Sequence, residues 1–170
     1  MANPIVTVVE AANNMKRLTK TLRFMKENYV LIGIPQKKTK REGEPVTNAE
    51  LLFIHTYGSP INNIPARPVI EPAIKDDKER LSKMLKRSAV LSLEGKEEEA
   101  VEQLKLTGMR GQNISRAWFT SPKNGWPPNS PSVAAAKRKK GSTNPMPLID
   151  TGELRKSIIY VVVKKGERVE

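Results

Sequence analysis

The placement of proline constrains the fold of this chain more than any other sequence feature. Prolines gather in two stretches, "SPINNIPARPVIEP" at residues 59–72 and "SPKNGWPPNSPSVAAAKRKKGSTNPMP" at residues 121–147. A proline fixes its own φ angle, lacks an N–H donor and pushes the residue before it toward extended backbone. We therefore expect the first stretch to be extended, with Arg67 on a stiff segment. The second is expected to be loop-like, with one helical turn near "PSVAAAKRK".

Outside the proline-rich stretches, apolar residues recur every three or four positions, which is the period of a helix. The first such helix is amphipathic, with Met15, Leu18 and Leu22 on its apolar stripe and basic residues between them. The full pattern predicts helices at about residues 10–26, 69–95, 96–120 and 151–157, and one of about ten residues between Thr47 and Gly58.

Individual residues indicate how two of these helices begin, end and pack. Thr47 and Glu50 predict a capping box, in which each side chain bonds the other residue's backbone N–H. Gly58 suits the left-handed position that follows a last helical turn. Gly108, Gly111 and Ser115 lie on the apolar stripe of the helix at 96–120, where another backbone could approach closely.

Two short apolar runs predict β-strands, "NYVLIGIP" at residues 28–35 and "IIYVVVKK" at residues 158–165. Strands and helices that do not alternate regularly favour an α+β fold. We expect a small antiparallel or mixed sheet packed against several helices, with long loops. A chain of 170 residues is long enough for one domain with a sizeable core, which we place at residues 1–170.

The chain is strongly basic, because 30 lysine and arginine residues against 18 acidic ones give a net charge of +12. This excess favours acidic partners, which include nucleic acid, an anionic membrane and an acidic protein surface. Exposed basic loops are expected at about residues 36–46 and 121–147. Their cations either face DNA or a partner protein or are merely solvated: Lys37, Lys38, Lys40, Arg41, Lys137, Arg138, Lys139 and Lys140.

Scarce residue types exclude several classes of site. Cysteine is absent, which excludes disulfides and thiolate metal sites, and a single histidine excludes paired-histidine chemistry. We interpret that histidine, His55, as a structural or surface residue rather than a catalytic base. No apolar run approaches the roughly 20 residues of a membrane span, and the N-terminus lacks a signal-peptide layout. We expect a soluble protein made inside the cell, without a membrane partner.

The triplet Asp150-Thr151-Gly152 follows two aliphatic residues and reads like the catalytic loop of an aspartic protease. In such a protease the triplet lies between strands, and two aspartates share one proton. Here the following residues favour a helix, and Asp150 precedes Glu153 by three positions, where a side-chain oxygen can cap the helix. We interpret Asp150 and Thr151 as structural helix caps. We expect no catalytic residue, no metal site and no cofactor.

Two long stretches, taken in order, resemble one family of proteins. "NAELLFIHTYGSPINNIPARPVIEPAI" resembles the segment of phage tail-completion proteins in which a helix ending in an aromatic-Gly turn leads to I-P-A-R-P. "WPPNSPSVAAAKRKKGSTNPMPLIDTGELRKSI" resembles their later segment, where a proline-serine turn precedes a basic stretch and then P-L-x-D-T-G-x-L-R-x-S-I. The N-terminal helix and strand fit the same pattern, so the resemblance covers about residues 10–163.

The resemblance implies a structural protein of long-tailed phages rather than an enzyme. Such proteins form a homo-oligomeric ring, usually a hexamer, at the head-proximal end of the tail. The implied partners are other copies of the chain, the tail tube or tail terminator protein, the head connector or adaptor protein, and DNA in the channel. The implied location is the virion neck, after assembly in the cytoplasm of the bacterial host.

Four residues are candidates for contacts with a neighbouring subunit or partner: Pro65, Arg67, Pro68 and Trp126. Two of them have alternatives, because Arg67 could pair with an acid of its own domain and Trp126 could anchor a loop. A free, sequence-independent DNA-binding protein is the alternative function, based on the net charge and the basic loops. Against it, the sequence has no recognition-helix motif and no basic stripe interleaved with aromatic residues.

Overall fold

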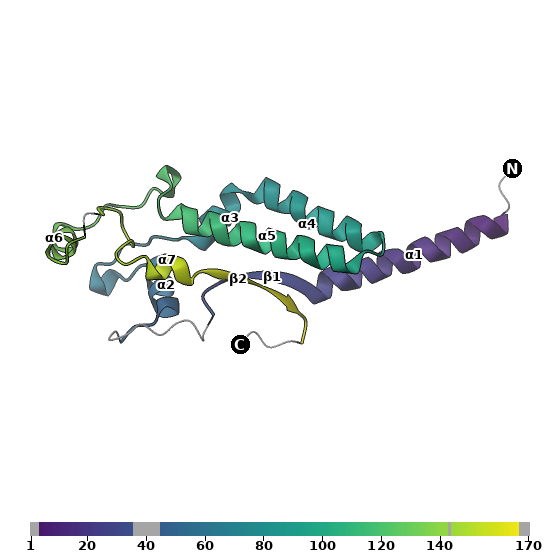
Figure 1. Ribbon diagram of the computed structural model, residues 1–170, viewed down its shortest axis with the longest axis horizontal. Helices are drawn as coiled ribbons and strands as arrows, with labels where there is room; N and C mark the ends of the chain where they lie inside the picture. Colours follow the sequence, from purple (N-terminus) through teal and green to yellow (C-terminus); the bar gives the residue numbers. More distant parts are fainter. Residues whose placement is uncertain (1–3, 36–44, 143, 167–170) are drawn as a thin grey trace. The chain divides into compact units, whose positions relative to one another are not determined.

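The computed structural model describes residues 4–35, 45–142 and 144–166. These residues are mostly helical and include a two-stranded antiparallel sheet, which confirms the expected α+β class (Figure 1). In chain order the elements are α1 (Pro4–Glu27), β1 (Asn28–Gly33), α2 (Asn48–Tyr57), the 3₁₀ turn η2 (Pro60–Asn62), α3 (Ile70–Asp76), α4 (Lys78–Leu93), α5 (Glu97–Trp118), the 3₁₀ turn η3 (Pro122–Asn124), α6 (Pro131–Lys139), α7 (Glu153–Ser157) and β2 (Ile159–Lys164).

The chain folds into two compact units. Unit 1 draws on Met1–Leu31, Glu79–Gly108 and Val161–Val169, and unit 2 on Ile32–Lys78 and Met109–Tyr160. The boundaries between them fall inside β1, at the start of α4, inside α5 and inside β2. The single domain expected at residues 1–170 stays a prediction.

Unit 1 is built on the helical hairpin of α4 and the first part of α5. One core cluster of unit 1 contains the side chains of Phe24, Leu91 and Leu104, which pack with Ala100. A small buried residue brings the two helices together, because Ser88 of α4 donates a hydrogen bond from Oγ to the carbonyl of Ala100 at 2.7 Å.

The N-terminal helix of unit 1, predicted at residues 10–26, is α1. Thr21 and Phe24 are buried, whereas every side chain from Val8 to Lys20 is exposed. Figure 1 shows the N-terminal half of α1 running past the end of the α4–α5 hairpin. The apolar stripe predicted from the sequence is therefore present on α1 but lies outside the core of unit 1.

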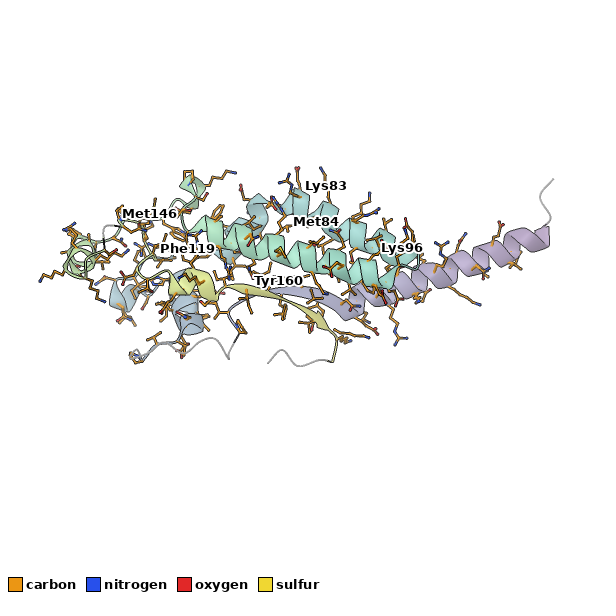
Figure 2. The ribbon with its side chains drawn as sticks, viewed as in Figure 1. Lys83, Met84, Lys96, Phe119, Met146 and Tyr160 are labelled. Atoms are coloured by element: carbon orange, nitrogen blue, oxygen red, sulfur yellow. The ribbon has the colours of Figure 1, made fainter. Side chains whose placement is uncertain are left out.

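Unit 2 has a core of larger side chains. Val69, Phe119 and Ile158 are fully buried, and Trp118 and Leu154 pack with them. Figure 2 shows Phe119 at the C-terminal end of α5. The core therefore joins residues from the proline-rich segment, the end of α5 and the region of α7 and β2.

Another part of the chain does approach Gly111 closely, as predicted, but the approaching group is a side chain and not a backbone. A Cβ atom added to this buried glycine would clash with Cδ1 of Ile32 and would lie 3.4 Å from Cδ1 of Ile74. The expectation of a second backbone at this position was wrong, because the isoleucine side chain of β1 occupies the space.

The single helix predicted at residues 69–95 is two helices. The chain leaves helical geometry at Asp77, between α3 and α4, with φ −103° and ψ 15°. The guanidinium of Arg110 on α5 binds the Asp77 carboxylate, with 2.6 Å between Nη2 and Oδ1. The break coincides with an ion pair that the pattern of apolar residues does not reveal.

The two predicted strands are confirmed as β1 and β2, which pair with each other. Just beyond β2, the backbone N–H of Lys165 donates to the carbonyl of Glu27 at 2.6 Å. The end of one strand thus meets the start of the other, as antiparallel pairing requires.

Candidate functional site

A groove of about 1240 Å³ opens in unit 2. Its walls come from α2, the residues 58–67 that follow it, part of α6 and the residues 148–154. These segments belong to the two stretches that resemble tail-completion proteins. The two stretches therefore meet around one cavity, which we call the unit 2 groove.

Helix α2 forms one wall, and the predicted capping box fixes its start. The N–H of Glu50 donates to Thr47 Oγ1 at 3.2 Å, and the N–H of Thr47 donates to Glu50 Oε2 at 2.8 Å. Gly58 ends the helix with φ 75° and ψ 176°, a conformation open almost only to glycine. A Cβ at Gly58 would lie 2.9 Å from the backbone of Ile64 and Ala66, so glycine is required for the chain to turn back along the groove.

Arg67 holds two loops together at the groove. Its backbone N–H donates to the carbonyl of His55 at 2.5 Å. Its guanidinium donates to the carbonyls of Pro127, at 3.0 and 3.3 Å, and Pro128, at 3.1 Å. Arg67 is only 6% exposed, and this burial lowers its pKa. Among the described residues the guanidinium binds backbone carbonyls rather than an acid of its own domain, which was one of the two alternatives for Arg67.

The other three candidate contact residues are Pro65, which is exposed, and Pro68 and Trp126, which are hydrogen-bonded to each other. Pro65 is exposed and lines the groove. Trp126 donates from Nε1 to the carbonyl of Pro68 at 3.1 Å, and its ring meets the Phe119 ring edge-on with 5.8 Å between centroids. Trp126 and Pro68 thus fix the second proline-rich stretch onto the core, which is the loop-anchoring role left open for Trp126.

The basic run at 137–140 lies at the end of a helix rather than in a loop. Residues 131–139 form α6, longer than the single turn predicted. Lys137 lines the groove, and its Nζ donates to the carbonyls of Met146 at 2.7 Å and Ile149 at 2.6 Å. Burial lowers the pKa of Lys137, an effect that the charge of Asp150 opposes. The remaining cations of the run are exposed: Arg138, Lys139 and Lys140.

The other basic loop was predicted at about residues 36–46. Residues 36–44, with the candidates Lys37, Lys38, Lys40 and Arg41, lie outside the described residues. Their predicted roles therefore stay predictions.

The cap predicted at Asp150 is wrong. Helix α7 has Gly152 at its N-cap position, with φ 78° and no side-chain cap bond. Because Gly152 adopts this conformation, α7 starts at Glu153 and Asp150 lies too far upstream to cap it. Thr151 supports the first turn only through a long bond of 3.4 Å from the N–H of Glu153. Asp150 is exposed at the groove, where its charge acts on Lys137.

His55, which reads as a structural residue in the sequence, is half-buried at the groove. Its Nδ1 atom is buried without a hydrogen-bond partner. Burial, with a smaller effect of the Arg67 charge, lowers its pKa to about 4. The imidazole is therefore neutral at physiological pH and adds no positive charge to the groove.

Two residues of the groove escaped sequence analysis. Asn48, the first residue of α2, is buried with Oδ1 unpaired. Leu148 adopts φ 59°, which is unusual for a residue with a side chain. Polar residues are common at helix starts, and no residue type marks a strained leucine. Neither position therefore carries a sequence signal.

In the part of the chain that the structure describes, no three histidine, aspartate or glutamate side chains gather closely enough to hold a metal ion. None of the described helices is long and apolar enough to span a bilayer. Comparisons with protein-family models, curated proteins and solved structures found no match. The likeness to tail-completion proteins thus stays a sequence-based prediction.

Proposed function

We propose that this chain is a structural virion protein that completes the head-proximal end of a phage tail and joins it to the head connector as a ring. The observation that supports this most is the meeting of two sequence stretches around the unit 2 groove. Both resemble segments of tail-completion proteins, and they lie more than 50 residues apart in the chain. A shared docking surface gives a physical reason for the two motifs to occur together.

The chemistry of the groove supports a docking role over a catalytic one. Two cations of the groove, buried Arg67 and half-buried Lys137, each donate to two backbone carbonyls of their own unit. His55 is neutral at physiological pH. Asp150 precedes a helix, whereas the protease loop that its triplet resembles lies between strands. These groups fix the shape of the groove, and shape is what a subunit interface requires.

The proposed partners are neighbouring copies of the chain, the tail tube or tail terminator protein, and the head connector. A segment of one of these would lie in the groove, against exposed Pro65 and the half-exposed Val133. A ring requires such a heterologous contact, in which a surface of one subunit receives a different surface of the next.

Deletion of the gene from the phage or prophage genome that carries it tests the proposal. We expect filled heads and separate tails by electron microscopy, and restored joining when the chain is supplied in trans. Val133→Glu, which places a charge in the groove at an exposed position, should fail to restore joining. The matched control Lys139→Glu changes an exposed α6 residue that does not line the groove and should restore it. Infectious, joined particles from the deletion would refute the function.

One observation favours the alternative of a free DNA-binding protein, namely the exposed cations Arg138, Lys139 and Lys140 at the end of α6. Binding through phosphate contacts would weaken steeply with salt, and three lost contacts would reduce the slope of log K against log salt by about 3. Fluorescence anisotropy with duplex DNA checks this alternative. Absence of binding at 50 mM salt would eliminate it.

A further inference from the structure

One side of α4 carries a row of cations. The helix contains five basic residues and a single acid, Glu79. Four of the basic residues fall within about a third of the helix circumference, because 3.6 residues complete one turn. We call these four exposed residues the α4 basic face: Arg80, Lys83, Lys86 and Arg87. Figure 2 shows Lys83 on the side of α4 that faces away from α5.

The opposite side of α4 holds the basic face in position. Leu81, Ser88 and Ser92 are buried there, and Ser88 donates its hydrogen bond to the carbonyl of Ala100 on α5. The helix is therefore fixed to unit 1 through its buried side. The cations stand on a formed element, so binding a ligand requires no ordering of the backbone.

Several cations on the neighbouring helices of unit 1 have partners within the chain. On α1, Arg17 donates to the carbonyl of Leu93 at 2.8 and 3.1 Å, and Lys20 pairs with Glu97 at 2.7 Å. On α5, Lys105 pairs with Glu102 at 3.0 Å. Unit 1 thus contains acids and carbonyls that bind cations.

The α4 basic face has no such partner among the residues that the structure describes. None of its four side chains forms an ion pair or a hydrogen bond there. Lys96, and to a smaller extent Arg87, lowers the pKa of Glu94, but the ion-pair partner of Glu94 is Lys96, at 3.0 Å. The charge of the face is therefore open to a ligand.

The cations of the face also repel one another. Lys83 lies three residues after Arg80, three before Lys86 and four before Arg87. Like charges at such spacings are neighbours on the helix surface and destabilise it. The row therefore opposes the folding of α4, whereas a bound polyanion would offset the repulsion.

The residues around the cations favour one class of polyanion. Helix α4 has no aromatic residue, and its exposed leucines lie off the face, Leu85 on another side and Leu93 beyond Arg87. A protein interface has an apolar core, an interfacial membrane helix carries apolar residues beside its cations, and single strands stack their bases on aromatic rings. The phosphate backbone of a duplex requires only cations.

We propose that the α4 basic face binds the phosphate backbone of a nucleic-acid duplex without reading its sequence. The distance from Arg80 to Arg87 along the helix is roughly 10 Å at 1.5 Å per residue. One strand of B-DNA presents about three phosphates over that length. The contact lies in unit 1, apart from the unit 2 groove and from the cations at the end of α6, and it does not depend on the proposed function.

Salt-dependent binding of the full chain to a labelled DNA duplex tests the proposal by fluorescence anisotropy. The test variant replaces all four cations by glutamine: Arg80→Gln, Lys83→Gln, Lys86→Gln and Arg87→Gln. Its slope of log K against log salt should be smaller by about 3–4, because each phosphate contact contributes about 0.9. Its affinity at about 50 mM salt should fall at least about tenfold. An unchanged slope would overturn the proposal.

A control variant loses the same charge from exposed positions elsewhere: Lys16→Gln, Lys26→Gln, Lys139→Gln and Lys140→Gln. We expect its slope to match that of the natural chain. If both variants lost equal slope, net charge would drive the binding and the proposal would be overturned.

Thermal unfolding without DNA checks that the test variant is intact. The replaced residues are exposed, and glutamine is a good helix former. At low salt the variant should therefore unfold at the same temperature as the natural chain or a higher one, because like-charge repulsion is removed. A lower unfolding temperature would show that the cations stabilise the chain's own fold, and would overturn the proposal.

Other anions give distinguishable results. An RNA duplex of the same sequence shares the phosphate backbone, and the tighter of the two duplexes identifies the natural source. Tighter binding to polyglutamate than to either duplex would overturn the proposal in favour of an acidic protein. Binding to vesicles with anionic lipid, without binding to a duplex, would overturn it in favour of a membrane.

The proposed function and this inference can fail separately. If the natural chain bound no duplex at about 50 mM salt, the inference would be refuted and head–tail joining would be unaffected. If binding depended on the α4 basic face, but deletion of the gene left head–tail joining intact, the function would be refuted and the inference would stand.

Discussion

The two units stabilise their folds in different ways, although both contain part of the same long helix. Unit 2 buries three large side chains completely and uses buried Arg67 and half-buried Lys137 to bind the carbonyls of its own loops. In unit 1 the cations Arg17 and Lys20 make exposed contacts instead, with the Leu93 carbonyl and with Glu97. A guanidinium thus binds buried carbonyls in unit 2 and an exposed carbonyl in unit 1.

Burial accounts for this difference. A hydrogen bond from a charged group contributes more when water cannot compete for either partner, and exposed ion pairs contribute little. Unit 2 contains the proline-rich stretches, which cannot form regular backbone hydrogen bonds and need side chains to fix them. Unit 1 consists mainly of helices, which satisfy their own backbone. The positions of the prolines therefore also explain why the buried cation, Arg67, lies in unit 2.

The largest expected effect is that of removing the central ring of unit 2. Phe119→Ala should lower the free energy of unfolding by about 3–5 kcal/mol, because Phe119 is fully buried and the core cannot collapse around the cavity. Both tryptophans, Trp118 and Trp126, lie in unit 2, so the urea midpoint of their fluorescence measures this loss.

Leu104→Ala in unit 1 is the matched comparison. It should cost about 2–5 kcal/mol. If the units unfold separately, it shifts the circular dichroism transition while tryptophan fluorescence stays nearly unchanged. Identical shifts in both signals for both variants would show that the two units unfold as one.

The second prediction compares two arginines that each donate to backbone carbonyls. Arg67→Met should cost about 2–3 kcal/mol, because it removes charged hydrogen bonds from a buried site. Arg17→Met removes two bonds to the Leu93 carbonyl at an exposed site and should cost less than about 1 kcal/mol. Urea unfolding of each variant measures the difference. If both variants lost the same free energy of unfolding, burial would not be the reason that the Arg67 hydrogen bonds contribute more.

Much of the fold follows from the sequence because local rules determine it. Helical periodicity located the helices, and the capping box at Thr47 was predicted from two residue types at a fixed spacing. The break at Asp77 was missed because its partner, Arg110, is 33 residues away in the chain. The role of Lys137 was missed for a related reason: a lysine in a basic run shows no sign of the carbonyls that its ammonium binds. The two stretches that line the groove were recognised in the sequence, but the sequence did not show that they lie around one cavity.

The third prediction concerns His55, whose pKa of about 4 lies below its unfolded value near 6.5. Between these values the unfolded chain binds a proton that the folded chain does not, so the free energy of unfolding should fall as pH drops from about 6.5 to 4. The loss should be about 1–2 kcal/mol, after allowance for the partial exposure of the ring.

Because the chain has one histidine, an NMR titration reads the His55 pKa without assignment of other residues. Arg67→Met should raise this pKa, since the Arg67 charge helps to lower it. His55→Gln should remove the stability difference between pH 6.5 and 4 that belongs to this residue. An NMR pKa near 6.5 in the natural chain would show that the ring is solvated.

The smallest expected losses of stability concern the starts of two helices. The cap of α2 was predicted correctly from the sequence, and the cap of α7 was not. Thr47→Ala removes a formed capping bond and should cost about 1 kcal/mol. Replacing Asp150 and Thr151 together by alanine should cost less than about 0.5 kcal/mol, because Gly152 holds the N-cap position of α7 and the one bond from this pair is long. Both α2 and α7 belong to unit 2, so tryptophan fluorescence in urea measures both variants on one scale. If the double variant lost as much as Thr47→Ala, the aspartate and threonine would cap α7 in solution, and the sequence-based assignment would have been correct.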